Sequence, residues 1–116
     1  MPIVEVTYAA TLPQERLTSL MRVLPRAVSL AVECPEEPYD GKLQPGDVDL
    51  RMRPRGPDDT GGLDVVVEVR SKWFESRAEN RQQRCDQLYD TVAEAAGTSS
   101  VGVYLSLPVA AWSQPE

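Results

Sequence analysis

Apolar residues in this chain recur first at every second position and then at helical spacing. Residues 3–8 alternate and are rich in β-branched side chains, which predicts a strand. Thr11 and Gln14 match a capping box, and Pro25 is expected either to kink or to shorten the helix that follows. That helix is predicted over residues 12–33 from an apolar face of Leu17, Leu20, Met21, Leu24, Val28 and Val32.

A loop and a second alternating segment come next. Residues 34–46 contain three prolines and two glycines, which favours a long loop. Residues 48–53 alternate strictly and predict a strand. Its two faces carry Val48, Leu50 and Met52 on one side and Asp49, Arg51 and Arg53 on the other. Residues 54–62 are rich in Pro, Gly and Asp and predict a linker or turn.

The pattern then repeats. Residues 63–69 predict an apolar strand, and Ser76 with Glu79 matches a second capping box. Gly97 is expected to end the following helix, and residues 101–107 predict the last strand. The apolar face of that second helix consists of Ala78, Cys85, Leu88, Tyr89, Val92 and Ala96.

This order predicts an α+β fold, an α/β sandwich built from tandem β-α-β units. The first unit covers residues 1–53 and the second covers residues 63–107, with a linker at 54–62 and a tail at 108–116, all in a single domain. The strands should form a four-stranded mixed sheet with two helices on one face. Because so many strand valines cannot all contact two helices, we expect apolar surface on the open face and association of copies through it.

Composition narrows the function classes. The chain has 116 residues, a net charge of −6 and no histidine. An acidic surface argues against nucleic acid or an anionic membrane as a partner. Without histidine, the commonest metal ligand and the usual acid–base group at neutral pH are missing, and no metal or cofactor is expected. Cys34 and Cys85 lack metal-type neighbours and are interpreted as buried apolar residues. No signal peptide or membrane-spanning run is visible, so we expect a cytoplasmic protein.

Pro2 is the sequence's candidate for proton chemistry. Removal of Met1 would leave Pro2 as a free secondary amine at the end of a buried strand, whereas retention of Met1 would leave an amide without a basic nitrogen. Burial and nearby cations lower the pKa of such an amine. A base whose pKa lies near the working pH is the most effective one.

Four segments carry a resemblance to a known family, and they lie in order along nearly the whole chain. They are residues 1–6 with their proline, residues 40–45 with a Gly-Lys pair, residues 75–83, and residues 103–112 with a Val-Pro-type tail ending in tryptophan. Together they resemble the tautomerase superfamily. The fused β-α-β-β-α-β members are the most similar: proteins like macrophage migration inhibitory factor, 5-carboxymethyl-2-hydroxymuconate isomerase, malonate semialdehyde decarboxylase and the cis-3-chloroacrylate dehalogenases.

The resemblance implies an activity and an assembly. It implies a homotrimer and a cofactor-independent tautomerase or isomerase in which Pro2 acts as general base or acid on small 2-oxo or 2-hydroxy-unsaturated carboxylic acids. Decarboxylase or hydratase/dehalogenase-type chemistry on a three-carbon acid is the enzymatic alternative. A non-catalytic trimeric binding or scaffold protein of the same fold is the other.

The resemblance also implies site residues. With Pro2, the catalytic candidates are Arg70, which ends the third predicted strand, and Tyr104. Cations are needed for the substrate carboxylate and for a developing enolate. The substrate-binding candidates are Lys42, Arg51, Arg53, Lys72 and Trp112.

Each candidate has a structural alternative. Arg51 and Arg53 could form a solvated, ion-paired face with Asp47 and Asp49. Tyr104 could be a packed strand aromatic. In the same way, the indole of the tail residue Trp112 could anchor the tail on a neighbouring subunit instead of lining a pocket.

Overall fold

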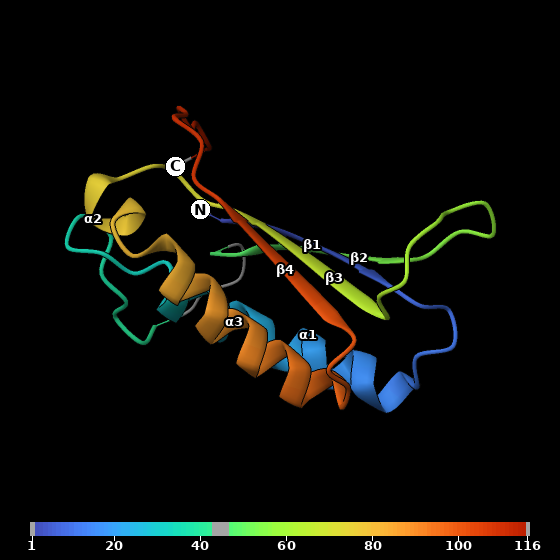
Figure 1. Cartoon of the computed structure of the whole chain (residues 1–116). Helices are drawn as coiled ribbons and strands as arrows, with labels where there is room; N and C mark the ends of the chain where they lie inside the picture. The colour runs from blue at the N-terminus through green and yellow to red at the C-terminus, as the bar shows by residue number, and fades with distance from the viewer. Residues whose placement is uncertain (1, 43–46, 116) are drawn as a thin grey trace.

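Four strands form one mixed sheet, and two long helices cover one of its faces (Figure 1). The computed structural model describes residues 2–42 and 47–115. The elements are β1 (Ile3–Tyr8), α1 (Gln14–Ala31), β2 (Asp49–Pro54), β3 (Val65–Arg70), α2 (Glu75–Ala78), α3 (Arg81–Ala96) and β4 (Val101–Ser106). The strand order is β2-β1-β3-β4, with β1–β2 and β3–β4 parallel and β1–β3 antiparallel. The predicted fold class is confirmed, and the second helical segment is divided into a short α2 and a long α3.

The core lies between the sheet and the helices because alternate strand residues face α1 and α3. Val4 pairs with Val69, and Val6 pairs with Val67, and all four side chains are buried. Burial of each such side chain contributes about 1.5–3 kcal/mol to folding. The helices supply the other wall of this core through Leu20, Leu24, Val28, Leu88 and Val92.

The open face of the sheet is mainly charged, so it carries less apolar surface than expected. Most strand valines lie on the helix side, where they are buried or packed against the core. Ile3 and Val66 are half-buried on the open face, and most of the other side chains there are charged, including Glu5, Arg51 and Arg70. Any contact made through this face would therefore be largely ionic.

Neither predicted capping box forms at a helix start. The N-cap of α1 is Pro13 and that of α3 is Asn80, and no side chain caps either helix. Ser76 instead lies inside α2 and donates from its hydroxyl to the carboxylate of Glu36 at 2.8 Å. The predicted end of the second helix is confirmed, since Gly97 adopts the left-handed conformation with φ of 70°.

The first helix continues through its proline. Pro25 lies inside α1, which extends to Ala31, so the proline does not shorten the helix. A proline in a helix interior costs about 3 kcal/mol. The buried side chains of Leu20, Leu24 and Val28 on the core face offset that cost.

Two arginines from the second half of the chain hold the end of α1. Nη1 of Arg84 donates to the carbonyls of Ala31 and Glu33 at 2.8 and 2.6 Å, and Nε of Arg77 donates to that of Val32 at 2.6 Å. The last turn of α1 has no basic residue of its own. These guanidinium groups therefore satisfy its terminal carbonyls and complement the negative end of its dipole.

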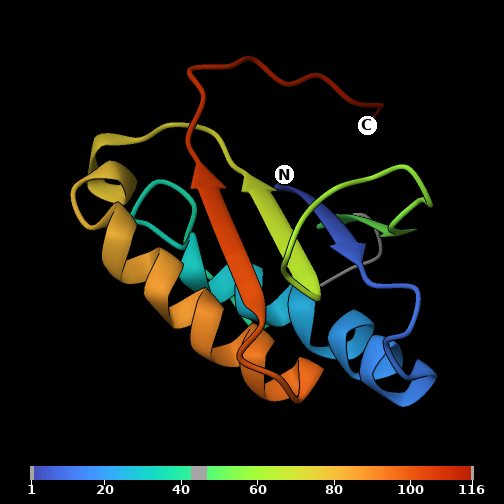
Figure 2. The same ribbon diagram turned by 45° about the vertical axis from the view of Figure 1, so that its right-hand side comes forward.

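The connecting segments differ in detail from the predicted boundaries. Pro54 is the last residue of β2, and Leu63 lies before β3. Of the predicted loop, residues 34–42 are described and contain only an isolated bridge between Cys34 and Glu37, while residues 43–46 lie outside the described residues. The tail after β4 is extended and passes above the start of β1 (Figure 2).

The structure also bears on the two cysteines and on membrane-spanning segments. Cys34 and Cys85 are both free thiols, and Cys85 donates to the carbonyl of Val103 at 3.3 Å. Burial raises the pKa of the Cys85 thiol. Within residues 2–42 and 47–115, none of the helices has the length and apolar character needed to cross a membrane.

Candidate active site

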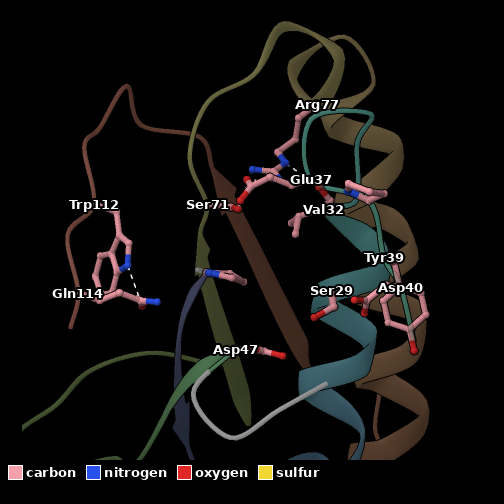
Figure 3. A pocket seen from close by; sticks show the side chains of 12 residues that line it. Ser29, Val32, Glu37, Tyr39, Asp40, Asp47, Ser71, Arg77, Trp112 and Gln114 are labelled. Carbon is pink, nitrogen blue, oxygen red and sulfur yellow. Dashed lines mark hydrogen bonds and ion pairs between the residues drawn. The ribbon is translucent and has the colours of Figure 1, made fainter. Parts of the chain in front are cut away.

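A cavity of about 450 Å³ opens where β1 begins, α1 ends and the tail crosses the sheet (Figure 3). Because β1 and β3 are antiparallel, the first residues of β1 lie beside the last residues of β3. α1 returns across the sheet from β1 to β2 and brings its carboxyl end to the same place. The lining residues are Pro2, Ser29, Val32, Glu37, Pro38, Tyr39, Asp40, Asp47, Ser71, Arg77, Trp112 and Gln114.

Pro2 lies at the entrance of β1 and lines this cavity. Its carbonyl accepts a hydrogen bond from the backbone N–H of Asp49 at 3.0 Å, which fixes the residue against β2. Pro2 shares the sheet face of Val4, because side chains two residues apart in a strand point the same way. With Met1 removed, a secondary amine would therefore border a polar cavity beneath the tail.

Arg77 is the cation of this cavity, and the sequence analysis did not single it out. Its side chain is 2% exposed, although it lies in a short helix. Nη1 donates to Ser71 Oγ at 3.0 Å and to the carbonyl of Lys72 at 2.6 Å, while Nη2 donates to Glu37 Oε1 at 3.2 Å. The Phe74 ring lies 5.2 Å from the guanidinium carbon. These contacts hold a buried guanidinium at one end of the cavity (Figure 3).

Carboxylates outnumber cations around the cavity. Among the lining side chains that the structure describes, three carry a carboxylate (Glu37, Asp40 and Asp47) and one carries a guanidinium (Arg77). Asp40 also accepts the backbone N–H of Lys42 at 2.9 Å. Neighbouring carboxylates favour the protonated form of an amine, so the surroundings of Pro2 favour an ammonium more than a cationic pocket would.

The three candidate arginines of the strands lie on the open face and converge on Glu5. Glu5 Oε1 is 3.1 Å from Nη2 of Arg70, 3.2 Å from Nη1 of Arg51 and 4.0 Å from Nη2 of Arg53. Arg51 also pairs with Asp49 at 3.1 Å. None of these arginines lines the cavity beside Pro2.

The pKa values of this network follow its contacts. Desolvation alone would raise the pKa of Glu5, but the charges of Arg70 and Arg53 and hydrogen bonds from Arg70 and Arg51 outweigh it, and the pKa is lowered. The hydrogen bond to Asp49 is the main cause that raises the pKa of Arg51. The open face is therefore held together by ion pairs between ionised groups.

The other candidates are dispersed. Lys42 and Lys72 do not line the cavity, and the ammonium of Lys72 lies 5.5 Å from the Phe74 ring centre. Tyr104 is 72% exposed and pairs with Glu68 across the strands. Trp112 does line the cavity, and its indole N–H donates to Gln114 Oε1 at 2.9 Å. Of the predicted set, Pro2 and Trp112 lie together in the lining of this cavity.

Ser71 is the lining residue that the strand pattern could have identified. Val65, Val67 and Val69 face the core, so the next residue on that face is Ser71, and Arg70 must point the other way. Arg77 carried no such signal, because a guanidinium in a short polar helix is normally solvent-exposed. Its burial depends on the carbonyl groups that meet it in three dimensions.

The fold matches those of several solved proteins, although sequence comparison alone finds nothing. No protein-family model matches the chain, and no curated protein does. Malonate semialdehyde decarboxylase superposes with a TM-score of 0.68 at 16% identity, covering 98% of this chain and 91% of that one. Leishmania major MIF2 gives 0.61 at 14% identity, covering 97% and 93%. A fused 4-OT symmetric trimer gives 0.62 at 16% identity, covering 91% and 85%. The fold expected from the resemblance to the tautomerase superfamily is thus confirmed.

Proposed function

We propose that this protein is a cofactor-independent enzyme of the tautomerase superfamily that acts on small 2-oxo or 2-hydroxy-unsaturated carboxylic acids through the amine of Pro2. The observation that carries the proposal is that Pro2 borders the same cavity as the buried guanidinium of Arg77. One group can move a proton, and the other is an anion-binding donor. The substrate class and the removal of Met1 both belong to the proposal.

In a tautomerase reaction the two groups would have separate tasks. For a 2-hydroxy-unsaturated acid, the Pro2 nitrogen would take the proton from the enol hydroxyl and return a proton to a carbon of the double-bond system as the carbonyl forms, so that the amine is regenerated. Nη2 of Arg77 and the Ser71 hydroxyl would hold the carboxylate and the developing enolate oxygen. Trp112 would form an apolar wall that limits access of water.

Decarboxylation or hydration of a three-carbon acid is a second candidate, and the acidic lining favours it. Carboxylates around Pro2 stabilise an ammonium, which suits a general acid better than a base. The ammonium would hydrogen-bond to the carbonyl of a 3-oxo acid. It would stabilise the negative charge that develops on the carbonyl oxygen as the bond to the carboxylate breaks and carbon dioxide leaves. The resulting enolate would then take a proton from the ammonium. The solved structure of malonate semialdehyde decarboxylase is described as explaining decarboxylase and hydratase activities.

One set of assays separates these reactions. Ketonisation of phenylenolpyruvate is followed by ultraviolet absorbance, and products from a 3-oxo acid are followed by nuclear magnetic resonance. Pro2→Ala is the matched variant, and intact mass spectrometry establishes whether Met1 is present. Loss of turnover in Pro2→Ala supports the proposal, and the substrate turned over selects the reaction. Equal turnover by both proteins would remove Pro2 from the mechanism.

We further propose that the protein works as a homotrimer. The outer strands β2 and β4 are sheet edges within the described chain, and Val109 and Trp112 in the tail are exposed apolar residues. Exposed edges and apolar tails are commonly covered by another chain. In such an assembly Arg51, Arg70 and Tyr104 would face a neighbouring copy. Sedimentation equilibrium would test this, with a monomer at assay concentration as the contrary result.

A further inference from the structure

Glu37 holds the one donor atom of Arg77 that is not bound to the surrounding framework. Nε and Nη1 of Arg77 donate to Val32, Ser71 and Lys72, groups that belong to the framework of the fold. Only Nη2 is directed to a half-exposed side chain, the Glu37 carboxylate at 3.2 Å. An incoming carboxylate would meet this carboxylate at the place where it must bind.

The Glu37 side chain can leave without unfolding the loop that carries it. Its backbone is fixed by a two-way pairing with Cys34, at 3.2 Å from Cys34 N to Glu37 O and 3.0 Å from Glu37 N to Cys34 O. The Glu37 side chain is 46% exposed, whereas that of Arg77 is 2% exposed. Rotation about the side-chain bonds of Glu37 is therefore sufficient to release Nη2 of Arg77, and water can then solvate the Glu37 carboxylate.

The remaining charges of the cavity set the kind of anion that can enter. Asp40 and Asp47 also line it, so a second negative charge on a ligand would meet like charges. A compact ligand with one carboxylate needs a single donor site and brings the least repulsion. The cavity volume of about 450 Å³ accommodates such a molecule.

We propose that Glu37 is a specificity-determining residue of this site: its carboxylate must turn away from Arg77 before a substrate carboxylate binds, so that the cavity selects small monocarboxylates over dicarboxylates. The inference rests on the proposed function only for the class of ligand. Glu37 is a competitor for the anion site, and it does not touch the reacting atoms.

Binding can be measured without turnover. The chain has two tryptophans, so Trp73→Phe leaves Trp112 as the single reporter on the cavity wall. In this background, propionate, malonate and the neutral propionamide are titrated into the otherwise wild-type protein, Glu37→Gln and Glu36→Gln. The amide oxygen of the glutamine can still accept from Arg77, so the guanidinium is not left bare. Glu36 pairs with Ser76 outside the cavity and controls for net charge.

We expect Glu37→Gln to bind propionate about tenfold more tightly, the size expected for removing one half-exposed like charge a few ångströms from the ligand. Malonate should bind more weakly than propionate in the wild type, and Glu37→Gln should reduce the ratio of these two affinities. Affinity for propionamide should not change. Glu36→Gln should match the wild type. Equal affinities in Glu37→Gln and wild type, an equal gain in Glu36→Gln, or no saturable binding in any protein would each overturn the inference.

Turnover distinguishes this inference from the proposed function. Pro2-dependent activity with no gain in carboxylate affinity would preserve the function and remove the role of Glu37. Tighter propionate binding without Pro2-dependent turnover would do the reverse.

Discussion

Arg70 and Ser71 are consecutive in the chain, yet their side chains bond on opposite faces of the sheet. Arg70 pairs with Glu5 on the open face at 3.1 Å, whereas Ser71 Oγ accepts from Arg77 at the cavity at 3.0 Å. One step along a strand turns the side chain to the other face. The cavity beside Pro2 is therefore lined by Ser71 and by Arg77, which donates to Ser71, and Arg70 lies on the other face.

Arg77→Met should destabilise the fold far more than Arg70→Met. The first change removes a buried guanidinium and leaves the carbonyls of Val32 and Lys72 without their donor. We expect a loss of about 3 kcal/mol in the free energy of unfolding, measured by urea denaturation. The Arg70 pair is partly exposed, and Glu5 keeps Arg51 and Arg53, so this control should change little. Similar losses in both variants would contradict the assignment of Arg77 as a buried anchor.

The stability of the open face should depend on pH through Glu5. The pKa of Glu5 is lowered in the folded protein from its usual value of 4.5. A carboxyl with a depressed pKa contributes stability above its unfolded pKa and loses it as the pH falls through the folded value. The difference in urea midpoint between wild type and Glu5→Gln should therefore be constant from neutral pH to about pH 5 and shrink below that. A difference that grows on acidification would have the wrong sign.

The unprotonated fraction of the Pro2 amine, which both alkylation and proton removal require, should increase towards mildly alkaline pH. An α-amino group has a reference pKa of about 8, and the carboxylates of Glu37, Asp40 and Asp47 around the cavity favour the charged form. The rate of alkylation by 3-bromopropiolate, followed by mass spectrometry, should therefore rise only above about pH 8. Glu37→Gln should move that rise to lower pH, and Glu36→Gln should not. A rise centred below neutrality would contradict the influence assigned to these carboxylates.

Gly97→Ala should cost about 1–2 kcal/mol because the residue has a positive φ of 70°. A Cβ there also comes within 2.6 Å of the Arg16 side chain, whose flexible end can move away. Gly97→Asn is the matched control, because it introduces the same Cβ contact but tolerates the left-handed conformation better. Thermal unfolding should place the asparagine variant between wild type and alanine. Equal midpoints for the two variants would assign the cost to Arg16 instead.

Much of the fold could be predicted from the sequence because it depends on local periodicity. The alternation around Val4, Val6 and Val67 placed the strands within one or two residues, and Gly97 ended α3 as expected. The helix starts were misjudged because capping motifs such as Thr11 with Gln14 compete with chain geometry that only the folded protein determines. The same alternation places Arg70 on the open face beside Glu5, whereas the family resemblance implied a catalytic role for it.

The site itself depends on contacts that periodicity does not contain. Arg77 is buried because carbonyls from the end of α1 and from the loop after β3 meet around it, two segments far apart in the chain. Glu37 lies in an irregular loop whose path is set by its pairing with Cys34. Neither residue has a sequence signature, so only the structure could place them together.

The hydrogen bond between Arg77 and the end of α1 makes Arg77 necessary for folding, which limits the positions that natural variation can alter. A change at Arg77 would be eliminated through misfolding before any new catalysis could be selected. The half-exposed side chain of Glu37 has no comparable structural role, so descendants of this chain could change substrate there while keeping the same scaffold. Libraries for directed evolution should accordingly vary the loop around Glu37 and leave the buried guanidinium untouched.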